Sequence, residues 1–421
     1  MKALIYTDLR VLPNQLFWHR DLGLLTKAFR TLGHDAWLVV HPATEPNATP
    51  AVPNKLDLPR EQPCGLSSEA LAKEEAQQGL PRLSVAGPHS LLPTRHPPPV
   101  TLQEPVIWAS PSDVRSPSWW QQHRPGLIIL GLWTRPKYDP IRRAALSATP
   151  RVIERADSDG MRTASCGLRT YARRRYDYFR DRTYRWPAVL SSPTSFLYSF
   201  ASILATPWIE ARLARTLRLL PAVAVETPHA MRRWKALAAR LGSDSGRLYC
   251  IPHAIQTEIF RPDSSVLKKK QVISVGRWES YQKNLPLLLK TLISFLSGQQ
   301  DWSALVVGSG LPPRPPHPQI TFSPPLAADL LARHMNASRV FLATSRYESF
   351  GLAAAEARAC GCCLVSPGPA PWDEMDPPTG PNESLEQRLL SCARGGLPVG
   401  NPSSWAKDLA PTVVASQFLN W

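Results

Sequence analysis

The chain has 421 residues, which is long for one ordinary domain and comfortable for two. Hydrophobic residues make up 43% of it, which is enough to build cores and excludes a disordered chain as the default interpretation. The formal net charge is +16, and a field of that sign favours nucleotides, nucleic acid or acidic membrane surfaces as partners without choosing among them.

The amino-terminal residues MKALIYTD have the pattern of a short strand. They contain neither the long apolar core nor the small-residue cleavage site of a signal peptide. The longest apolar-leaning segment, 195–221, is interrupted by Pro207 and Glu210, so we do not expect it to span a membrane. These features predict a cytoplasmic protein.

The seven cysteines are odd in number, and their spacing shows no disulfide framework. Cys360, Cys362 and Cys363 form a cluster, but no second pair of ligands follows at the spacing of a zinc site. We therefore expect reduced thiols and no bound metal.

Apolar residues recur along the chain in two series of strand and helix patterns. In the first series the predicted strands are ALIYT, HDAWLVVHP, PVIWA, GLIILGLW, PRVIERA, AVAVET and RLYCIP. Its predicted helices are 14–33, the basic stretch 169–187, an apolar segment near 195–220, and 229–241. The second series begins near 271 with the strands QVISVG, SALVVGSG, SRVFLAT and CCLVS, alternating with the helices LPLLLKTLISFL, LAADLLARHM and SFGLAAAEARAC. This alternation predicts an α/β protein with two parallel sheets in tandem Rossmann-like domains and an active site in the cleft between them.

Composition suggests where these domains begin and end. A polar stretch at 261–270 separates the two series, so we expect an N-terminal domain over 1–263 and a C-terminal domain over 264–408. Proline and polar residues dominate about 42–105, which predicts an irregular insertion in the first domain. Residues 409–421 are expected to form a helix that packs back on the N-terminal domain.

The first motif, SVGRWESYQKN (274–284), ends a predicted strand. Gly276 permits a sharp turn where a ligand approaches, and Arg277 and Lys283 supply two cations just past the strand end. Two cations in this place suit a diphosphate. An ordinary surface turn explains the same fragment.

The second motif, TSRYESFGLAAAEARACG (344–361), also follows a predicted strand. Its residues Ser349, Phe350 and Gly351 would begin a helix whose free N–H groups favour phosphate or sugar oxygens. Glu348 in the turn and Glu356 in the helix could accept hydrogen bonds from ribose or sugar hydroxyls. The alternative to a binding site is that one of these two glutamates caps the helix and the other is solvated.

Taken in order, IPHAIQTEIFRP (251–262), SVGRWESYQKN, VVGSG (306–310) and SRYESFGLAAAEARACG resemble retaining glycosyltransferases of the GT-B fold, family 4. The resemblance covers about 222–366, and LTKAFRTLGHDAWLVV near the amino terminus is similar to that family's opening. It implies an acceptor bound by the first domain and a nucleoside diphosphate sugar bound by the second, with no cofactor and no metal.

The resemblance also implies roles for single residues. Arg277 and Lys283 would hold the donor diphosphate, Glu348 the hydroxyls of the transferred sugar, and Glu356 the ribose. The backbone at Phe350, Gly351 and Leu352 would meet sugar or phosphate oxygens, next to Gly276 and Ser349. Cations and the helix dipole would then neutralise the departing diphosphate.

The acceptor side departs from the family pattern. His253 stands where the family usually has asparagine, and TDLRVLPNQ replaces the usual glycine-rich loop. In place of a histidine that faces the sugar, PRVIERADSDG offers Asp157, a catalytic candidate, or Asp159. His19 and Asp159 are the acceptor-side candidates.

The residues DSD (157–159) also allow a GT-A fold, in which such a pair chelates a divalent ion. The preceding ERA is polar rather than a buried strand, and the downstream motifs belong to GT-B.

We therefore expect a glycosyltransferase acting with retention on an unknown acceptor, which could be a glycan, a lipid or a small molecule. The alternatives are a nucleotide-sugar epimerase or phosphorylase, and a non-catalytic basic binding protein on the same scaffold. The stretch 169–187 interleaves tyrosine and arginine, which suits an anionic membrane at the inner face of the cell or, less well, nucleic acid. It also fits a solvated helix with Arg–Asp pairs four residues apart.

Overall fold

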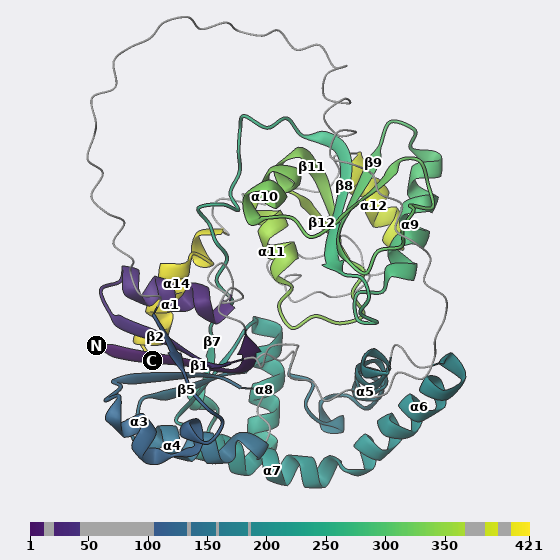
Figure 1. The fold of residues 1–421 in the computed structure, drawn as a ribbon. Helices are drawn as coiled ribbons and strands as arrows, with labels where there is room; N and C mark the ends of the chain where they lie inside the picture. Colours follow the sequence, from purple (N-terminus) through teal and green to yellow (C-terminus); the bar gives the residue numbers. More distant parts are fainter. Residues whose placement is uncertain are drawn as a thin grey trace, which may run out of the picture. The chain divides into compact units, whose positions relative to one another are not determined.

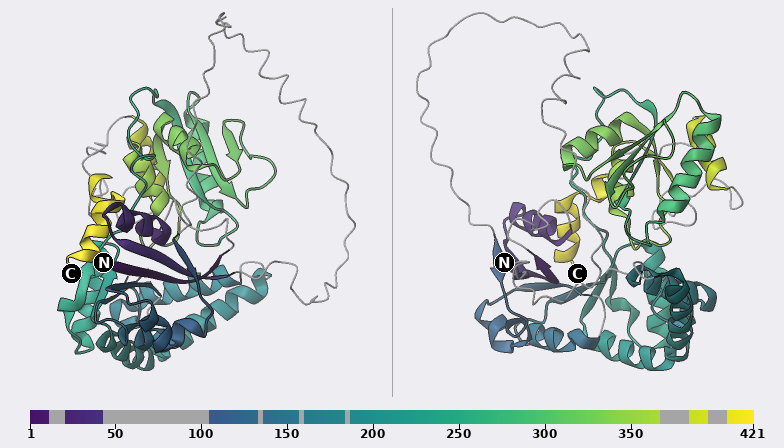
Figure 2. Two further views of the ribbon diagram at one scale, coloured as in Figure 1. Left: turned by 60° about the vertical axis from the view of Figure 1, so that its left-hand side comes forward. Right: turned by 45° about the vertical axis from the view of Figure 1, so that its right-hand side comes forward.

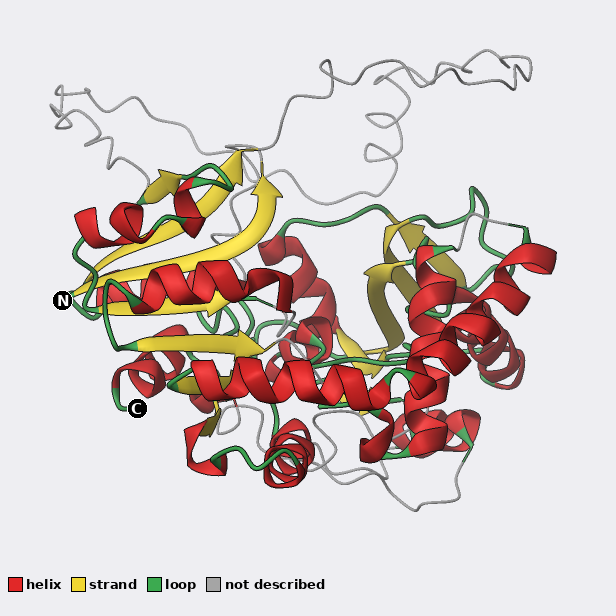
Figure 3. Ribbon diagram, turned by 90° about the horizontal axis from the view of Figure 1, so that it is seen from below, coloured by secondary structure: helices red, strands yellow, loops and turns green. Residues whose placement is uncertain are grey.

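The computed structural model describes residues 1–11, 21–42, 105–132, 136–156, 160–183, 187–366, 384–394 and 406–421. Apart from its two ends, the expected insertion at about 42–105 lies outside these residues. The described residues contain two separate sheets, and every strand pair in both is parallel. Helices flank both sheets (Figure 3).

The first sheet has the strand order β3-β2-β1-β4-β5-β6-β7 (Figure 1). Its strands are β1 (Lys2–Val11), β2 (Asp35–Pro42), β3 (Val106–Trp108), β4 (Leu127–Gly131), β5 (Val152–Ala156), β6 (Ala222–Val225) and β7 (Leu248–Cys250). The helices of this half are α1 (Asp21–Thr31), α3 (Pro117–Gln122), α4 (Asp139–Leu146), α5 (Leu168–Arg182), α6 (Ala188–Leu204), α7 (Thr206–Leu219) and α8 (Pro228–Arg240). Because side chains alternate along a strand, Ile5 packs in the core under α1, whereas Leu4 packs in the core on the opposite face.

The second sheet has the order β10-β9-β8-β11-β12. Its strands are β8 (Lys269–Arg277), β9 (Ser303–Ser309), β10 (Ile320–Ser323), β11 (Ser338–Leu342) and β12 (Cys363–Val365). The helices are α9 (Leu285–Gly298), α10 (Ala328–Ala337), α11 (Leu352–Ala359) and α12 (Leu385–Ala393). This order, in which the chain moves outward from β8 first to one side and then to the other, is that of a Rossmann half-sheet. The expectation of two parallel α/β sheets is confirmed.

The last helix, α14 (Pro411–Leu419), lies beside α1 in each view (Figure 2). Val414, Ala415 and Phe418 are fully buried and share a core with Leu25 and Phe29 of α1. The end of the chain therefore completes the core of the first sheet. The expected domain limits stay a prediction.

Three expectations about local structure are wrong. The segment near 195–220 is not one helix, because α6 ends before Ala205 and α7 begins at Thr206, where Pro207 fits the first turn. The sequence patterns also missed β10, α3 and α4, which are short. Finally, the polar residues ERA lie in β5, where every residue is buried.

Burial of Glu154 in β5 is possible because α4 supplies its partner. The Nε and Nη2 atoms of Arg142 lie 2.5 and 3.0 Å from the two carboxylate oxygens of Glu154. Nη1 of the same arginine donates to Asp139 at 2.7 Å. Both Arg142 and Glu154 are fully buried, so each charge depends on the other.

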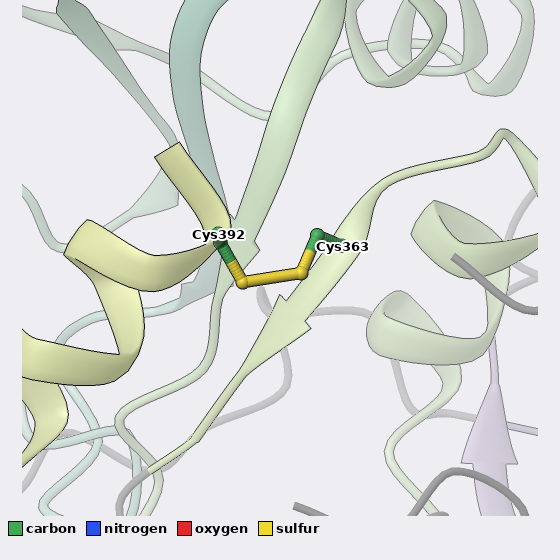
Figure 4. Close-up of a disulfide and its surroundings, with 2 residues drawn as sticks. All are labelled: Cys363 and Cys392. Atoms are coloured by element: carbon green, nitrogen blue, oxygen red, sulfur yellow. A yellow bond between two sulfur atoms is a disulfide. The ribbon is translucent and has the colours of Figure 1, made fainter. Parts of the chain in front are cut away.

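The cysteines also differ from expectation, since Cys363 of β12 and Cys392 of α12 form a disulfide (Figure 4). The expectation of reduced thiols is wrong for this pair. The two residues are 29 positions apart, and only the packing of α12 against β12 brings them together. Cys360 and Cys362 are free and buried.

Candidate functional site

A cavity of about 700 Å³ lies at the carboxyl ends of β8 and β11. These neighbouring strands form the point where the strand order of the second sheet reverses, and α/β sheets bind ligands at such points. The lining includes each candidate residue from the second half of the chain: Gly276, Arg277, Lys283, Glu348, Ser349, Phe350, Gly351, Leu352 and Glu356. The two motifs, which are more than sixty residues apart in the sequence, therefore meet around one space.

Two glycines shape one wall of the cavity. Gly276 of β8 pairs with Gly308 of β9, and Gly308 has a φ of +143°, which favours glycine. A Cβ atom at Gly308 would lie 1.8 Å from the carbonyl oxygen of Gly276. The strand ends can approach this closely because Gly308 carries no side chain, while a Cβ atom at Gly276 would lie 3.2 Å from the ring of Trp278. The indole N–H of the buried Trp278 donates to the carbonyl of Val307 and fixes the turn after β8.

The loops that follow β8 and β11 are joined by hydrogen bonds. The amide of Arg346 donates to the carbonyl of Gln282 at 2.8 Å, and the Gln282 side chain donates to the carbonyl of Tyr347 at 2.9 Å. The hydroxyl of Thr344 donates to the carbonyl of Lys283 at 3.0 Å. These hydrogen bonds hold the two loops against each other.

This joined pair of loops places Lys283 against Glu348. The ammonium of Lys283 donates to a carboxylate oxygen of Glu348, and both side chains are partly buried. Arg277, at the end of β8, is exposed at the cavity. The site therefore holds one cation paired with a carboxylate and a second cation open to solvent.

The far wall is the start of α11. Gly351, with a φ of +83°, turns the chain into the helix, and the first turn directs N–H groups outward. Phe350 is buried below the turn. Glu356, one turn further along α11, is 98% buried yet lines the cavity. A carboxylate on the wall of a cavity can accept hydrogen bonds from a ligand's hydroxyl pair.

Helix α5, the basic stretch, contacts these loops. Asp181 accepts hydrogen bonds from the hydroxyl of Ser280 at 2.7 Å and the amide of Gln282 at 3.1 Å. The guanidinium of Arg174 lies 3.7 Å from the ring centroid of Tyr347. The helix also has an Arg173–Asp177 pair at 3.0 Å, four residues apart. Part of the basic stretch thus supports the loops rather than facing solvent.

The first half contributes a charged cluster, mostly buried, that the sequence analysis did not identify as part of the site. His253 donates to Glu226 at 2.5 Å, and its other ring nitrogen lies 3.4 Å from Asp21. Arg155 lies 3.4 Å from the same carboxylate of Asp21. Burial and the charge of Arg155 oppose protonation of His253, but Glu226 and Asp21 outweigh them and raise its pKa to about 9. The imidazole is therefore positively charged at neutral pH.

His253 and Asp21 line the same cavity as Glu348, and the His253 ring lies 5.3 Å from the Phe350 ring. The sequence signalled His253 only as a departure from asparagine, and Asp21 only as a residue within a helix pattern. His19, Asp157 and Asp159 lie outside the described residues.

Among the described residues there is no group of three side chains that could hold a metal ion, and no helix long and apolar enough to cross a membrane.

Comparisons with known proteins agree with this geometry. Residues 269–370, which carry both motifs, match the family model described as glycosyl transferases group 1. Two of the solved structures that resemble the whole chain are the following. A complex of Anabaena HepE with UDP-glucose has a TM-score of 0.54 and 13% identity over 100% of this chain and 98% of that one. Sucrose-phosphate synthase from Thermosynechococcus elongatus has a TM-score of 0.52 and 14% identity over 99% and 94%.

The chain has the GT-B fold. A curated relative, D-inositol 3-phosphate glycosyltransferase of Acidothermus cellulolyticus, is 26% identical over 152 residues, which are 30% of this chain and 34% of the relative. The alignment thus spans about a third of that relative.

Proposed function

We propose that the protein is a glycosyltransferase that transfers a sugar from a nucleoside diphosphate sugar to an acceptor with retention of anomeric configuration. The observation that carries the proposal is the convergence of Arg277, Lys283, Glu348 and Glu356 on one cavity at the reversal point of the second sheet. The match of 269–370 to glycosyl transferases group 1 supports the reaction class.

In this proposal the donor displaces the ion pair between Lys283 and Glu348. The diphosphate takes the ammonium of Lys283 and the guanidinium of Arg277, while the N–H groups at Gly351 and Leu352 bind sugar or phosphate oxygens. Glu348 is then free to accept from sugar hydroxyls, and Glu356 accepts from the ribose. The two cations and the helix terminus stabilise the charge that develops as the diphosphate leaves, so we propose that no metal ion is required.

The acceptor would attack from the face that the diphosphate leaves, and the leaving phosphate would take its proton. No strong protein base is needed for such a step. His253 and Asp21 are the polar groups that the first half places on the cavity, so we propose that the acceptor hydroxyl binds near them. Asp157, as a catalytic contact, and His19 and Asp159 remain proposed residues of the acceptor side.

Release of nucleoside diphosphate from sugar nucleotides tests this function. UDP-glucose is the first donor to try, because the HepE structure contains it. We expect turnover that EDTA does not abolish, and a loss of about 100-fold in kcat/KM for Lys283→Ala and for Glu356→Ala. Lys290→Ala, which removes an exposed lysine of α9, is the matched control and should keep wild-type activity.

Equal turnover in all four proteins would refute the site assignment. Loss of activity in EDTA would refute metal independence, and inversion in the product's NMR spectrum would refute retention. An epimerised sugar without transfer would indicate an epimerase. If no sugar nucleotide binds, the alternative of a non-catalytic basic binding protein gains support.

A further inference from the structure

Helix α6 has its apolar residues on the outside. Six large hydrophobic side chains are mostly exposed: Val189 (76%), Leu190 (58%), Phe196 (69%), Leu197 (65%), Phe200 (52%) and Leu204 (66%). At 100° per residue they cover an arc of about 120° of the helix. The arc contains no charged residue.

The opposite face of α6 is polar and buried. Ser191, Ser195 and Ser199, each four residues apart, are almost fully enclosed. The hydroxyl of Ser199 donates to the carbonyl of Ala172 in α5, and Tyr176 of α5 shares a hydrogen bond with Ser192 at 2.8 Å. The helices α5 and α6 thus pack through polar contacts, reversing the usual polarity of a helix on a water-soluble domain.

The apolar arc continues into α7. Trp208, near the start of α7, is 61% exposed, and the guanidinium of Arg212 lies 4.4 Å from its ring centroid. Arg212 in turn lines a cavity of about 230 Å³ together with Lys137, Arg143 and Arg215. The one carboxylate there, Asp139, already accepts from Arg142 and Thr216. A cationic cavity therefore adjoins the apolar arc.

The net charge of residues 168–219 indicates which kind of partner binds the apolar arc of α6. Residues 168–219 contain ten arginines and three carboxylates, a net charge of +7. All three carboxylates are engaged, Asp177 with Arg173, Asp181 with Ser280, and Glu210 with Arg240. A second copy would bring like charges together, and a nucleic acid has no use for six exposed aliphatic and phenyl groups. Acyl chains beneath anionic headgroups match both properties.

We propose that α6 and the start of α7 bind in the interface of an anionic phospholipid bilayer. The apolar arc of α6 would enter the acyl region, Trp208 would lie at the headgroup level, and Arg212 and Arg215 would contact lipid phosphates. This surface differs from the basic stretch of α5, part of which supports the loops of the proposed donor site. The inference does not depend on glycosyl transfer, since binding is measured without a donor.

Vesicle co-sedimentation of the full chain tests the proposal. We expect binding to phosphatidylcholine vesicles that contain phosphatidylglycerol, and little binding to phosphatidylcholine alone. The triple variant Phe196→Ser/Leu197→Ser/Phe200→Ser should bind at least about tenfold more weakly even at low salt, because it loses the inserted apolar area. Arg212→Gln/Arg215→Gln should weaken binding mainly at low salt.

The control Leu267→Ser/Leu330→Ser removes exposed leucines from the other half of the chain and should bind as the wild type does. Circular dichroism should show all variants folded, because every substituted side chain is exposed except Arg212, which is half-buried. Absence of wild-type binding at low salt, or wild-type binding by the triple variant, would overturn the proposal. So would a lipid-free dimer that the triple variant converts to a monomer, because a second copy would then cover α6.

Discussion

At the scale of single residues, the buried charge of His253 has a measurable consequence for stability. Its pKa of about 9 in the folded protein exceeds the value of about 6.5 expected in the unfolded chain. A raised pKa stabilises the fold fully below the unfolded value, and this contribution is lost as the pH rises through the folded value. We therefore predict that the free energy of unfolding falls between pH 6.5 and 9, by on the order of 2 to 3 kcal/mol.

Urea unfolding of the wild type and of His253→Gln across this range measures the effect. The side chain at 253 is neutral at every pH in the variant, so the variant lacks this contribution below about pH 9. The informative quantity is the slope of the unfolding free energy against pH. It should be steeper for the wild type by an amount that corresponds to at most one additional bound proton in the folded state. Parallel slopes would show that folding does not raise the pKa of His253.

At the scale of helices and strands, the sequence predicts the elements that are long enough to show a regular spacing of apolar residues. The apolar residues Val272, Ile273 and Val275 of β8, the run ALVV of β9 and the helical spacing of apolar residues in α9 and α10 made these elements predictable. Elements such as β10 and α4 are too short to establish a period. Glu154 shows a further limit, because its polarity argued against a buried strand and only Arg142, twelve residues away, makes that burial possible.

The candidate site also has residues that the sequence predicts and residues that it does not. Arg277, Lys283, Glu348 and Glu356 were found because each follows a strand within a local motif, and parallel strands bring their carboxyl ends to one edge of the sheet. His253 joins the cavity through Glu226 and Asp21, which are distant in the sequence. No local pattern records such a contact.

The disulfide between Cys363 and Cys392 also belongs to this scale, because it ties β12 to α12. We predict that Cys392→Ser lowers the free energy of unfolding by about 2 to 4 kcal/mol in non-reducing buffer, since the link restricts the unfolded chain. Cys250→Ser, which replaces an exposed cysteine outside this pair, is the control and should have little effect.

Thiol titration of the denatured protein checks the link itself. Reduction should add two reactive thiols in the wild type. An equal number of thiols with and without reduction would contradict the disulfide and restore the expectation of reduced cysteines.

At the scale of the whole molecule, each sheet has its own cores, and among the described residues after β12 it is α14 that returns to the core of the first sheet. Phe418 is fully buried against α1, so Phe418→Ala should lower the free energy of unfolding of this part by about 3 to 5 kcal/mol through lost burial and the cavity it leaves. Hydrogen exchange should show the loss of protection in α1 and β1, while β8 and β9 in the second sheet keep theirs. Val413→Ala, at a partly exposed position of the same helix, is the control for changes in α14 itself and should leave exchange unchanged. An equal loss of protection in both sheets would mean that they unfold as one cooperative unit, whereas no loss in α1 would show that α14 contributes nothing to the first core.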